Sequence, residues 1–387
     1  MKILMVHPHD FQSPMEPWTI RILKLADELA NKGHEIKIVY FSMKPSPRGT
    51  FRNIPIIPIN RTISLGSMWG NFKTLLGMAR WAEMVHVQKS HFYAAIPAVA
   101  AAYTANKPLH YDWDDWEEKI FFSSIQRISP SSVLTGFSFY MLERCLPFLA
   151  DSVSVASDAL RTLALRRGAD KKRIAMAPVG ADLVQFSPAQ DRDAVRQKYK
   201  ITTEVLVLYH GQLHSCQYVR LFLKAIRMIE DKNLGAGLKF MIMGSGYDLG
   251  PLQTFTEELG LKERVIFTDF VQHEDVPAHI AAADICVAPF EDNEITRCKS
   301  PLKIVEYLAS GKPIVASDIG EVRYMIEGAG LLVPPGRADE IARGILALAA
   351  DAPRREAMSV AARKRAEEKY NWRVSAESIE RVYEMDL

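Results

Sequence analysis

A lysine in the first turn of a predicted helix is the first residue of this sequence that points to chemistry. Ser300 is a good N-cap, Pro301 suits the first helical position and Gly311 can end the helix. Lys303 lies where the helix dipole and the unpaired N–H groups favour a negative charge, so a bound anion would explain it. The alternative is an exposed ion pair with Glu306 at i,i+3, worth only about 0.2–0.5 kcal/mol.

Three aspartates and two tryptophans lie together in HYDWDDWEE (110–118), at the carboxyl end of a predicted strand. Carboxylates there could orient sugar hydroxyls or stabilise a developing oxocarbenium ion, and tryptophan faces can stack on sugars. Asp112, Asp114 and Asp115 are therefore candidate residues of a carbohydrate site. An acidic loop that caps the following helix is the alternative.

The loop after the first predicted strand, HPHDFQSPMEPW (7–18), carries further polar side chains. His7, His9, Asp10 and Glu16 could contact a substrate there. Single histidines in such loops more often have structural roles, so both interpretations stay open.

The elements that would position these residues alternate between strand and helix, and the alternation occurs twice. The first series predicts strands over 2–6, 35–41, 83–88, 108–112, 152–157 and 173–180, with helices over 18–33 and 92–105. The second predicts strands over 204–211, 239–246, 264–271 and 285–290, with helices over 218–230, 252–260 and 275–283. This α/β pattern predicts two doubly wound parallel sheets that bind ligands at the carboxyl ends of their strands.

Turn residues at 179–190 predict the domain boundary, so we expect domains over 1–185 and 186–387 with a cleft between them. The tail is predicted to be helical with a bend near Asn371.

Composition favours a two-domain globular protein: 387 residues, 48% hydrophobic and 24% charged. Residues 1–185 carry 22 Lys and Arg against 16 Asp and Glu, a net charge of +6, which suits anionic lipids or phosphorylated acceptors, or is a plain solvated surface. No cluster of cations and aromatic residues indicates nucleic acid. The four scattered cysteines and the amino terminus, which has no signal-peptide layout, favour a cytoplasmic protein.

Two apolar-rich stretches, 66–81 and 131–149, lie in the basic half. They could touch a membrane peripherally, or they could be ordinary core helices. The longest apolar run, about eight residues from Ile96 to Tyr103, is well short of the ~20 that span a bilayer.

Motifs along nearly the whole chain resemble the retaining glycosyltransferase family 4. They are NKGHEIKIVYF (31–41), APVGADLVQFSP (177–188), HGQL (210–213), MIMGSG (241–246), RVIFTDFVQHEDVPAHIAAADICVAPF (264–290), SPLKIVEYLASGKPIVASDIGEV (300–322), GLLVPPGRADEIARGI (330–345) and YNWRVSAESIERVYE (370–384). The resemblance implies a GT-B fold, in which an N-terminal Rossmann-like domain binds the acceptor and a C-terminal one binds a nucleotide-sugar. It also implies that the last helix, about 372–387, crosses back to the first domain.

The resemblance further implies a transfer that retains configuration and needs neither metal nor cofactor, and no cluster of carboxylates for a divalent cation is obvious. The acceptor would be a glycan or lipid-linked, and nucleic acid is not expected as a partner. A front-face mechanism is expected, in which the leaving phosphate takes the proton of the acceptor hydroxyl.

Individual site residues follow from the matching positions. The donor site would comprise Gly211, Gln212, Gly244, Gly246, Phe270, Val271, Ser300, Pro301, Leu302, Lys303 and Glu306, with Glu306 on the nucleotide ribose. Asp114 stands where the family often has a histidine that touches the transferred sugar, so Asp114, Asp112 and Lys303 are the catalytic candidates and His9, Asp10 and Asp115 the acceptor contacts. A simple tight turn at the glycines and a core role for Phe270 are the alternatives.

The sequence departs from the family pattern at three donor contacts. Gln212 replaces the usual arginine, Cys216-Gln217 the lysine pair, and Cys298 the first of two glutamates. Lys303, Lys299, Arg297 or Arg220 could restore the charge, and Glu294 or Glu291 the carboxylate. These departures leave two other hypotheses open: a GT-B protein without transferase activity that serves as a binding or scaffold partner, and a sugar-nucleotide epimerase.

Overall fold

The computed structural model describes residues 1–12, 19–125, 127–213 and 217–385. The chain divides into two compact units. Unit 1 comprises Met1–Val179, Cys298–Ser300 and Trp372–Leu387, and unit 2 comprises Gly180–Arg297 and Pro301–Asn371. Unit 1 therefore takes up the last helix of the chain, and the first crossing between the units lies at 179/180, where the sequence predicts turns.

Unit 1 is an α/β unit built on an eight-stranded sheet of the order β3-β4-β2-β1-β5-β6-β7-β8 among the described residues. Its strands are β1 (Lys2–His7), β2 (Glu35–Ser42), β3 (Gly49–Phe51), β4 (Ile54–Asn60), β5 (Met84–Gln88), β6 (Leu109–Trp113), β7 (Ser152–Val155) and β8 (Ile174–Met176). Its helices are α1 (Ile20–Asn31), α2 (Leu65–Trp81), α3 (Phe92–Thr104), α4 (Glu117–Ser124), α5 (Pro130–Leu149), α6 (Asp158–Arg166), the 3-10 helix η1 (Lys171–Arg173) and α16 (Trp372–Tyr383). The strands pair in parallel except for the edge strand β3, which is antiparallel to β4.

Alternating side chains of these strands pack on two helical layers. Val85, Val87 and Tyr111 belong to the hydrophobic core shared with α2, α3, α5 and α6. The even-numbered residues of β6 point to the opposite face of the sheet, which α1 and α16 cover. Buried polar side chains lie between this face and the two helices. The site in unit 1 depends on this polar layer.

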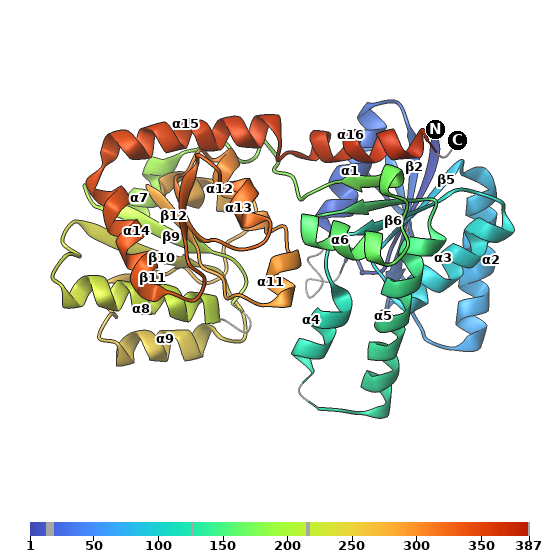
Figure 1. Ribbon diagram of the computed structural model, residues 1–387, viewed down its shortest axis with the longest axis horizontal. Coiled ribbons are helices and arrows are strands. Elements are labelled where there is room, and N and C mark those ends of the chain that lie inside the picture. The colour runs from blue at the N-terminus through green and yellow to red at the C-terminus, as the bar shows by residue number, and fades with distance from the viewer. Residues whose placement is uncertain (13–18, 126, 214–216, 386–387) are drawn as a thin grey trace. The chain divides into compact units, whose positions relative to one another are not determined.

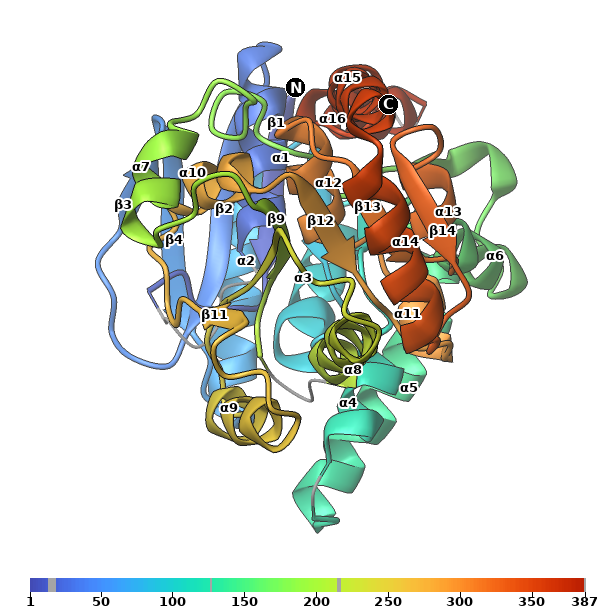
Figure 2. The same ribbon diagram turned by 90° about the vertical axis from the view of Figure 1, so that its left-hand side faces the viewer.

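Unit 2 repeats the plan with a six-stranded parallel sheet of the order β11-β10-β9-β12-β13-β14. The strands are β9 (Val205–His210), β10 (Leu238–Met243), β11 (Val265–Phe267), β12 (Ile285–Ala288), β13 (Ile314–Ser317) and β14 (Gly330–Val333). The helices are α7 (Arg192–Lys198), α8 (Gln217–Asp231), α9 (Leu249–Glu258), α10 (Val276–Ala282), α11 (Glu294–Cys298), α12 (Leu302–Ala309), α13 (Val322–Met325), α14 (Ala338–Ala350) and α15 (Ala352–Glu368). Figure 2 shows α8 and α14 on one face of this sheet and α10 and α12 on the other.

The predicted fold class is confirmed: both units are Rossmann-like, with parallel sheets and covering helices. The break between α15 and α16 falls at 369–371, where a bend is predicted. Among the described residues, no helix combines the length and apolar character needed to cross a bilayer.

Candidate active site

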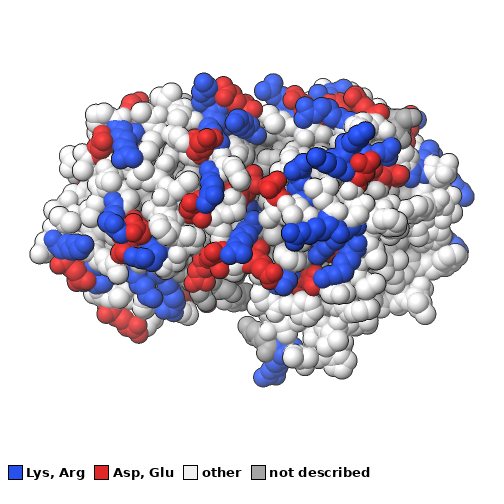
Figure 3. Space-filling view, viewed as in Figure 1, with Lys and Arg blue, Asp and Glu red and all other residues white. Residues whose placement is uncertain are grey.

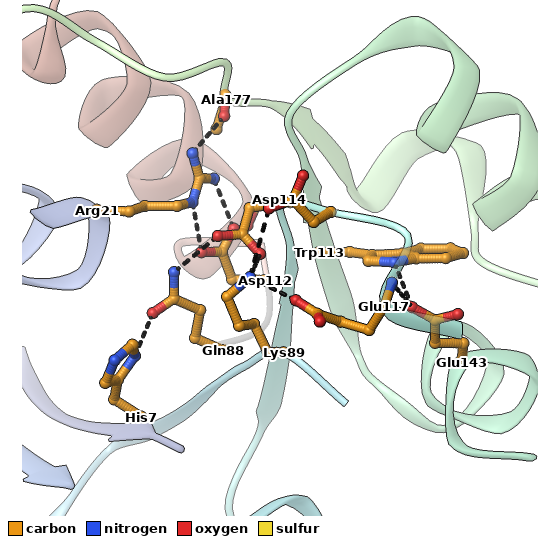
Figure 4. A network of polar contacts seen from close by, with 12 residues as sticks. His7, Arg21, Gln88, Lys89, Asp112, Trp113, Asp114, Glu117, Glu143 and Ala177 are labelled. Atoms are coloured by element: carbon orange, nitrogen blue, oxygen red, sulfur yellow. Dashed lines mark hydrogen bonds and ion pairs between the residues drawn. The ribbon is translucent and has the colours of Figure 1, made fainter. Parts of the chain in front are cut away.

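Asp112 lies at the centre of a buried polar network in unit 1 (Figure 4). Arg21 of α1 donates two hydrogen bonds to its carboxylate, Nε to Oδ2 at 2.8 Å and Nη2 to Oδ1 at 2.6 Å, and a third to the carbonyl of Ala177 at 2.9 Å. Ser154 Oγ donates to Asp112 Oδ1 at 2.5 Å. Burial alone would raise the pKa of Asp112, but the guanidinium of Arg21 outweighs it and holds that pKa below its ordinary value.

These contacts correct the catalytic role predicted for Asp112. The side chain is fully buried and both of its oxygens accept hydrogen bonds from the protein, so it is not available to a sugar. It joins β6 to α1 and to the strand β7 beside it. Its position at the carboxyl end of a strand is as predicted, but its alternation on the pleat directs it toward α1.

His86 and Tyr383 continue this buried layer. Tyr383 of α16 has its hydroxyl 2.5 Å from His86 Nδ1, and His86 Nε2 lies 3.8 Å from Asp112 Oδ2. Burial lowers the pKa of His86 to about 4, so the imidazole is neutral at physiological pH. A hydrogen bond between a neutral ring and the Tyr383 hydroxyl thus joins the last helix of the chain to the middle of the unit 1 sheet.

Lys89 is not among the site residues predicted from the sequence. Its ammonium lies among the carboxylates of the acidic loop. Its Nζ lies 3.0 Å from Asp114 Oδ1, 3.6 Å from Asp115 Oδ2 and 2.5 Å from Glu117 Oε1. The side chain is 3% exposed. Burial alone would lower the pKa of Lys89, but the three carboxylates raise it well above its ordinary value. The sequence does contain a signal for this site. A lysine comes directly after β5, and the acids come directly after β6, the strand that pairs with β5.

The backbone at Lys89 is in the left-handed region, with a φ of 65°. A residue other than glycine rarely adopts this conformation, which costs about 1–3 kcal/mol. The surrounding ion pairs offset the strain and direct the side chain from the end of β5 across to the loop that follows β6. We infer that the Lys89 ammonium is a permanent part of this site.

The same three carboxylates could in principle hold a metal ion, because their oxygens lie within 4.8 Å of one another. No such cluster is obvious in the sequence. Lys89 Nζ already lies among these oxygens and supplies the positive charge that a divalent ion would bring. Burial, together with the charge of Asp114, raises the pKa of Asp115 to about 6.

Asp114, Asp115 and Glu117 of the acidic loop stay partly open. Their side chains are 11%, 32% and 13% exposed, in contrast to Asp112. Gln88 Nε2 donates to Asp114 Oδ2 at 3.2 Å, and Gln88 Oε1 lies 2.7 Å from His7 Nδ1. The carboxyl ends of β1, β5 and β6 therefore meet in one line of hydrogen bonds that fixes Asp114.

The loop after β1 is held by its own polar residues. Asp10 accepts from Ser42 Oγ at 2.7 Å and from the Gln12 amide at 3.0 Å, which favours a structural role for this predicted acceptor contact. His9 is 6% exposed, and its ring packs edge-on against His7 and His91. Glu16 lies outside the described residues.

In unit 2, Lys303 lies against the loop that follows β9. Its Nζ donates to Tyr209 Oη at 2.9 Å, and a Cβ at Gly211 would lie 2.7 Å from that nitrogen. Gly211 has a φ of 147°, and a Cβ at Gly244 would collide with the Gly211 carbonyl, so the MGSG turn packs directly on this loop. The glycines therefore serve close approach of two loops and not only a tight turn.

Helix α12 begins at Leu302, with Pro301 as the N-cap residue, and no side chain caps it. Ser300 is not the N-cap that the sequence predicts. Its hydroxyl accepts from the Val179 amide at 3.2 Å within unit 1, and its place in the donor site stays a prediction. The N-cap residue of α12 therefore gives no side-chain hydrogen bond to the first turn, where the Leu302 and Lys303 amides lie.

Glu306 is 4% exposed, which excludes the exposed ion pair considered from the sequence. Its Oε2 lies 2.6 Å from His210 Nε2, and the His210 amide donates to Tyr307 Oη at 2.9 Å. The end of β9 and the first turns of α12 are therefore joined through His210.

Comparisons with known proteins place these observations in a family. Residues 204–351 match the family described as glycosyl transferases group 1. We call residues 204–351 the group 1 domain, after the family that they match. It contains Lys303, Gly211, Gly244 and Glu306, and the resemblance stated from the sequence is confirmed at this level.

The curated relatives of this chain are also glycosyltransferases. Alpha-D-kanosaminyltransferase of Streptomyces kanamyceticus is 27% identical over 54% of this chain and 53% of its own. A GDP-mannose-dependent phosphatidylinositol monomannoside mannosyltransferase of Mycolicibacterium smegmatis is 30% identical over 51% and 52%. The chain therefore spans about half the length of these two relatives. A D-inositol 3-phosphate glycosyltransferase of Corynebacterium glutamicum is 26% identical over 88% of both chains.

Solved structures share the fold. HepE of Anabaena, crystallised with UDP, has a TM-score of 0.75 at 18% identity and is covered completely by this chain. Sucrose-phosphate synthase of Thermosynechococcus elongatus has a TM-score of 0.74 at 18% identity, with 99% and 98% covered. Both are similar to this chain in fold, which is GT-B.

Among the cations considered as replacements in the group 1 domain, Arg297 pairs with Asp292 at 2.6 Å. The guanidinium of Arg220 lies 4.6 Å from the ring centroid of Phe255. Lys299 belongs to unit 1. Lys303 is the one for which the described residues give a contact with the Gly211 loop.

The remaining departures also have a place in the structure. Gln212 is exposed at the end of the HGQ turn, whereas Cys216 lies outside the described residues. Cys298 is 3% exposed, and its carbonyl accepts from Ser157 Oγ at 2.7 Å within unit 1. No carboxylate therefore stands at the position of the family's first glutamate.

Phe270 of the group 1 domain is 66% exposed, so the core role considered for it is wrong. Tyr247 is 78% exposed. The two aromatic residues follow β11 and β10, which are parallel neighbours, so both belong to the same edge of the sheet. Val271, beside Phe270, is half-buried.

Proposed function

We propose that this protein is a glycosyltransferase that moves a sugar from a nucleotide-sugar to a glycan or a lipid-linked acceptor. Unit 2 would bind the donor and unit 1 the acceptor. The observation that carries the proposal is the Lys303 ammonium against the Gly211 loop, at the start of α12 in the group 1 domain.

This site suits the leaving diphosphate. Negative charge grows on its oxygens as the glycosidic bond breaks, and amide N–H groups at a helix start together with a fixed ammonium stabilise that charge. The Leu302 and Lys303 amides and Lys303 Nζ would bind the phosphates, and Glu306 would bind the ribose. Phe270 and Tyr247 offer exposed rings to a base. The UDP bound to the structurally similar HepE is consistent with a nucleoside diphosphate ligand.

We propose that the transfer retains configuration and needs no metal. The acceptor oxygen forms its bond to the anomeric carbon on the face from which the phosphate oxygen leaves, and that phosphate oxygen takes the hydroxyl proton. Asp114, fixed by Gln88 and Lys89, would orient a hydroxyl of the transferred sugar. The positive charge that a metal often provides would come from Lys303 and the amides of α12.

We also propose that the protein works in the cytoplasm and contacts the membrane peripherally when the acceptor is lipid-linked. The net charge of +6 over residues 1–185 supports this, because anionic lipids attract cations.

Calorimetry of the full chain against UDP, GDP, ADP and their common sugar conjugates tests the donor proposal. Binding of one nucleotide series is expected, unchanged by EDTA. NMR of the sugar released by slow donor hydrolysis then reports the configuration at the anomeric carbon. Binding of none of these nucleotides would overturn the proposal.

A non-catalytic GT-B binding partner is the second candidate, favoured by Gln212 and by Cys298 at positions where the family carries charge. It predicts nucleotide binding without donor hydrolysis or transfer to any acceptor. An epimerase, the third, would convert a nucleotide-sugar in the absence of an acceptor.

A further inference from the structure

The end of the α4–α5 hairpin exposes an apolar surface. Ile128 is 85% exposed, Val133 56%, Leu134 68% and Phe137 57%. With Ser129 and Pro130 they line a shallow hollow, and we call these six residues the hairpin end. Figures 1 and 2 show α4 and α5 extending together beyond the sheet of unit 1. Contiguous apolar surface of this kind marks an interaction site.

The polar groups of the hairpin end bond within the hairpin. Ser129 Oγ accepts from the Ser132 amide at 3.1 Å, and the Ser129 amide donates to Ser132 Oγ at 2.8 Å. Pro130 has no N–H group to satisfy. Other hydroxyls of the hairpin donate to carbonyls of their own helix: Ser123 to Ile120, Ser124 to Phe121 and Ser138 to Thr135. Removing this surface from water therefore leaves few unsatisfied groups, which is the requirement for contact with lipid.

The outer part of the hairpin, residues 119–142, carries charge of one sign. Residues 119–142 contain Lys119 and Arg127 and no Asp or Glu. In Figure 3 the extended part of unit 1 is mostly white, with blue at its end. An apolar surface bordered by cations is suited to the headgroup region of anionic lipids.

The start of α2 has the same character. Leu65 is 90% exposed and Trp69 58%, and Lys73 Nζ lies 5.2 Å from the Trp69 ring centroid. Residues 36–82 contain seven Lys or Arg and no Asp or Glu. Helix α2 follows the carboxyl end of β4, and α4 follows that of β6. Both surfaces therefore belong to the edge of the sheet that holds the Lys89 cluster.

We propose that the hairpin end and the start of α2 form one docking surface for an anionic lipid bilayer. The inference deepens the proposed function and rests on it for the lipid-linked acceptor, which would meet the acidic loop at the same sheet edge. A second copy of this chain is disfavoured as occupant, because it would bring two positive surfaces together. A protein partner would favour a rim with charges of both signs.

Co-sedimentation of the full chain with vesicles tests the proposal. We expect binding to vesicles of phosphatidylcholine mixed with phosphatidylglycerol, and much weaker binding to phosphatidylcholine alone. The variant V133S/L134S/F137S should bind the mixed vesicles at least about tenfold more weakly, because each side chain loses its apolar transfer free energy. Arg127→Glu should weaken the same binding severalfold and reduce its sensitivity to salt.

A matched control changes three exposed apolar residues of unit 2, as V184S/L234S/V360S. It should bind vesicles like the unsubstituted protein, and circular dichroism with thermal unfolding should show all variants folded. Equal binding of V133S/L134S/F137S and the control would overturn the proposal, as would absence of binding to mixed vesicles. Light scattering that shows a dimer converted to a monomer by V133S/L134S/F137S would assign the surface to self-association instead.

Nucleotide calorimetry without vesicles separates this inference from the proposed function. V133S/L134S/F137S should bind the nucleotide as the unsubstituted protein does. Vesicle binding without nucleotide binding would overturn the proposed function alone, whereas nucleotide binding without vesicle binding would overturn the docking surface alone.

Discussion

Three buried or half-buried cations define the chemistry of this protein at the scale of single residues. Arg21 neutralises Asp112 within the core, where no ligand reaches. Lys89 neutralises an acidic loop that stays partly open, and Lys303 lies beside a glycine loop. The three sites differ in the group that a ligand could contact. Arg21 and Asp112 offer none, the site of Lys89 offers carboxylate oxygens, and Lys303 offers a positive charge.

Lys89→Met should convert the acidic loop into a site for divalent cations. The substitution leaves Asp114, Asp115 and Glu117 close together without their counter-charge, which destabilises the protein by about 2 kcal/mol, less than for a fully buried pair. Calcium should then restore stability in the variant, since carboxylate oxygens bind it well. Thermal unfolding with and without calcium measures this.

Lys171→Met is the control at an exposed lysine of the same unit. If calcium raised the melting temperature of the unsubstituted protein as much as that of Lys89→Met, the ammonium would not be occupying the site.

Lys303→Ala should weaken nucleoside diphosphate binding about tenfold or more, since a hydrogen bond to a charged group contributes about 1.5–3 kcal/mol. Calorimetry measures the change, with Lys262→Ala at a 71% exposed position as control. An unchanged affinity in Lys303→Ala would remove Lys303 from the donor site.

At the scale of elements, a carboxyl group of α5 joins the two helices at the base of the α4–α5 hairpin. Glu143 of α5 accepts from the Glu117 amide at 2.8 Å, from Trp113 Nε1 at 3.2 Å and from the Glu118 amide at 3.3 Å. It thus caps the start of α4 from another helix, as Figure 4 shows for Glu117 and Trp113. Burial, and then the charge of Glu117, raises the pKa of Glu143 to about 8.

Glu143→Gln should change how stability depends on pH. Because the folded-state pKa of about 8 exceeds the ordinary value of 4.5 for a glutamate, the folded protein holds one more proton than the unfolded chain between these values. Stability therefore falls as pH rises through this window, and the glutamine variant lacks this contribution. Urea unfolding from pH 5 to pH 9 should show a shallower decline for Glu143→Gln.

Glu143→Ala serves as the comparison. It removes the acceptor at every pH and should cost about 1–3 kcal/mol. A parallel decline in Glu143→Gln and the unsubstituted protein would show that Glu143 does not titrate in this range.

Element types were predictable from the sequence wherever periodicity was strong, and most predicted strands lie within two residues of their observed bounds. Strand β4 was missed because Pro55 and Pro58 argue against a strand, yet it pairs with both β2 and the edge strand β3. The roles of the site residues were harder to predict from the sequence. Whether an acid at the end of β6 faces a ligand or a helix depends on the pleat and on Arg21, which lies 91 positions away. Lys89 and Glu143 likewise act through partners distant in sequence.

At the scale of the whole molecule, the chain builds unit 1 from both of its ends. Trp372, Ile379 and Tyr383 of α16 are buried, and Ser375 Oγ donates to the Pro178 carbonyl at 2.7 Å. Glu380 binds Lys32 and His34 near the end of α1. Unit 2 is almost uninterrupted, broken only at 298–300.

A fragment of residues 180–371 should therefore fold alone, whereas residues 1–179 should not. The first keeps the whole unit 2 core, and the second leaves the apolar and polar groups under α16 exposed. Circular dichroism and hydrogen exchange measure this, and a peptide of residues 372–385 added to 1–179 should restore protection. Full protection of 1–179 without the peptide would contradict the prediction.

The membership of α16 in unit 1 also bears on how the protein is made. A ribosome releases the amino-terminal residues first, yet helix α16, which bonds His86 and packs on α1, emerges only after unit 2. During synthesis, unit 2 can therefore complete its core while residues 1–179 still lack helix α16. Nascent chains stalled before residue 372 should accordingly be the form on which chaperones act.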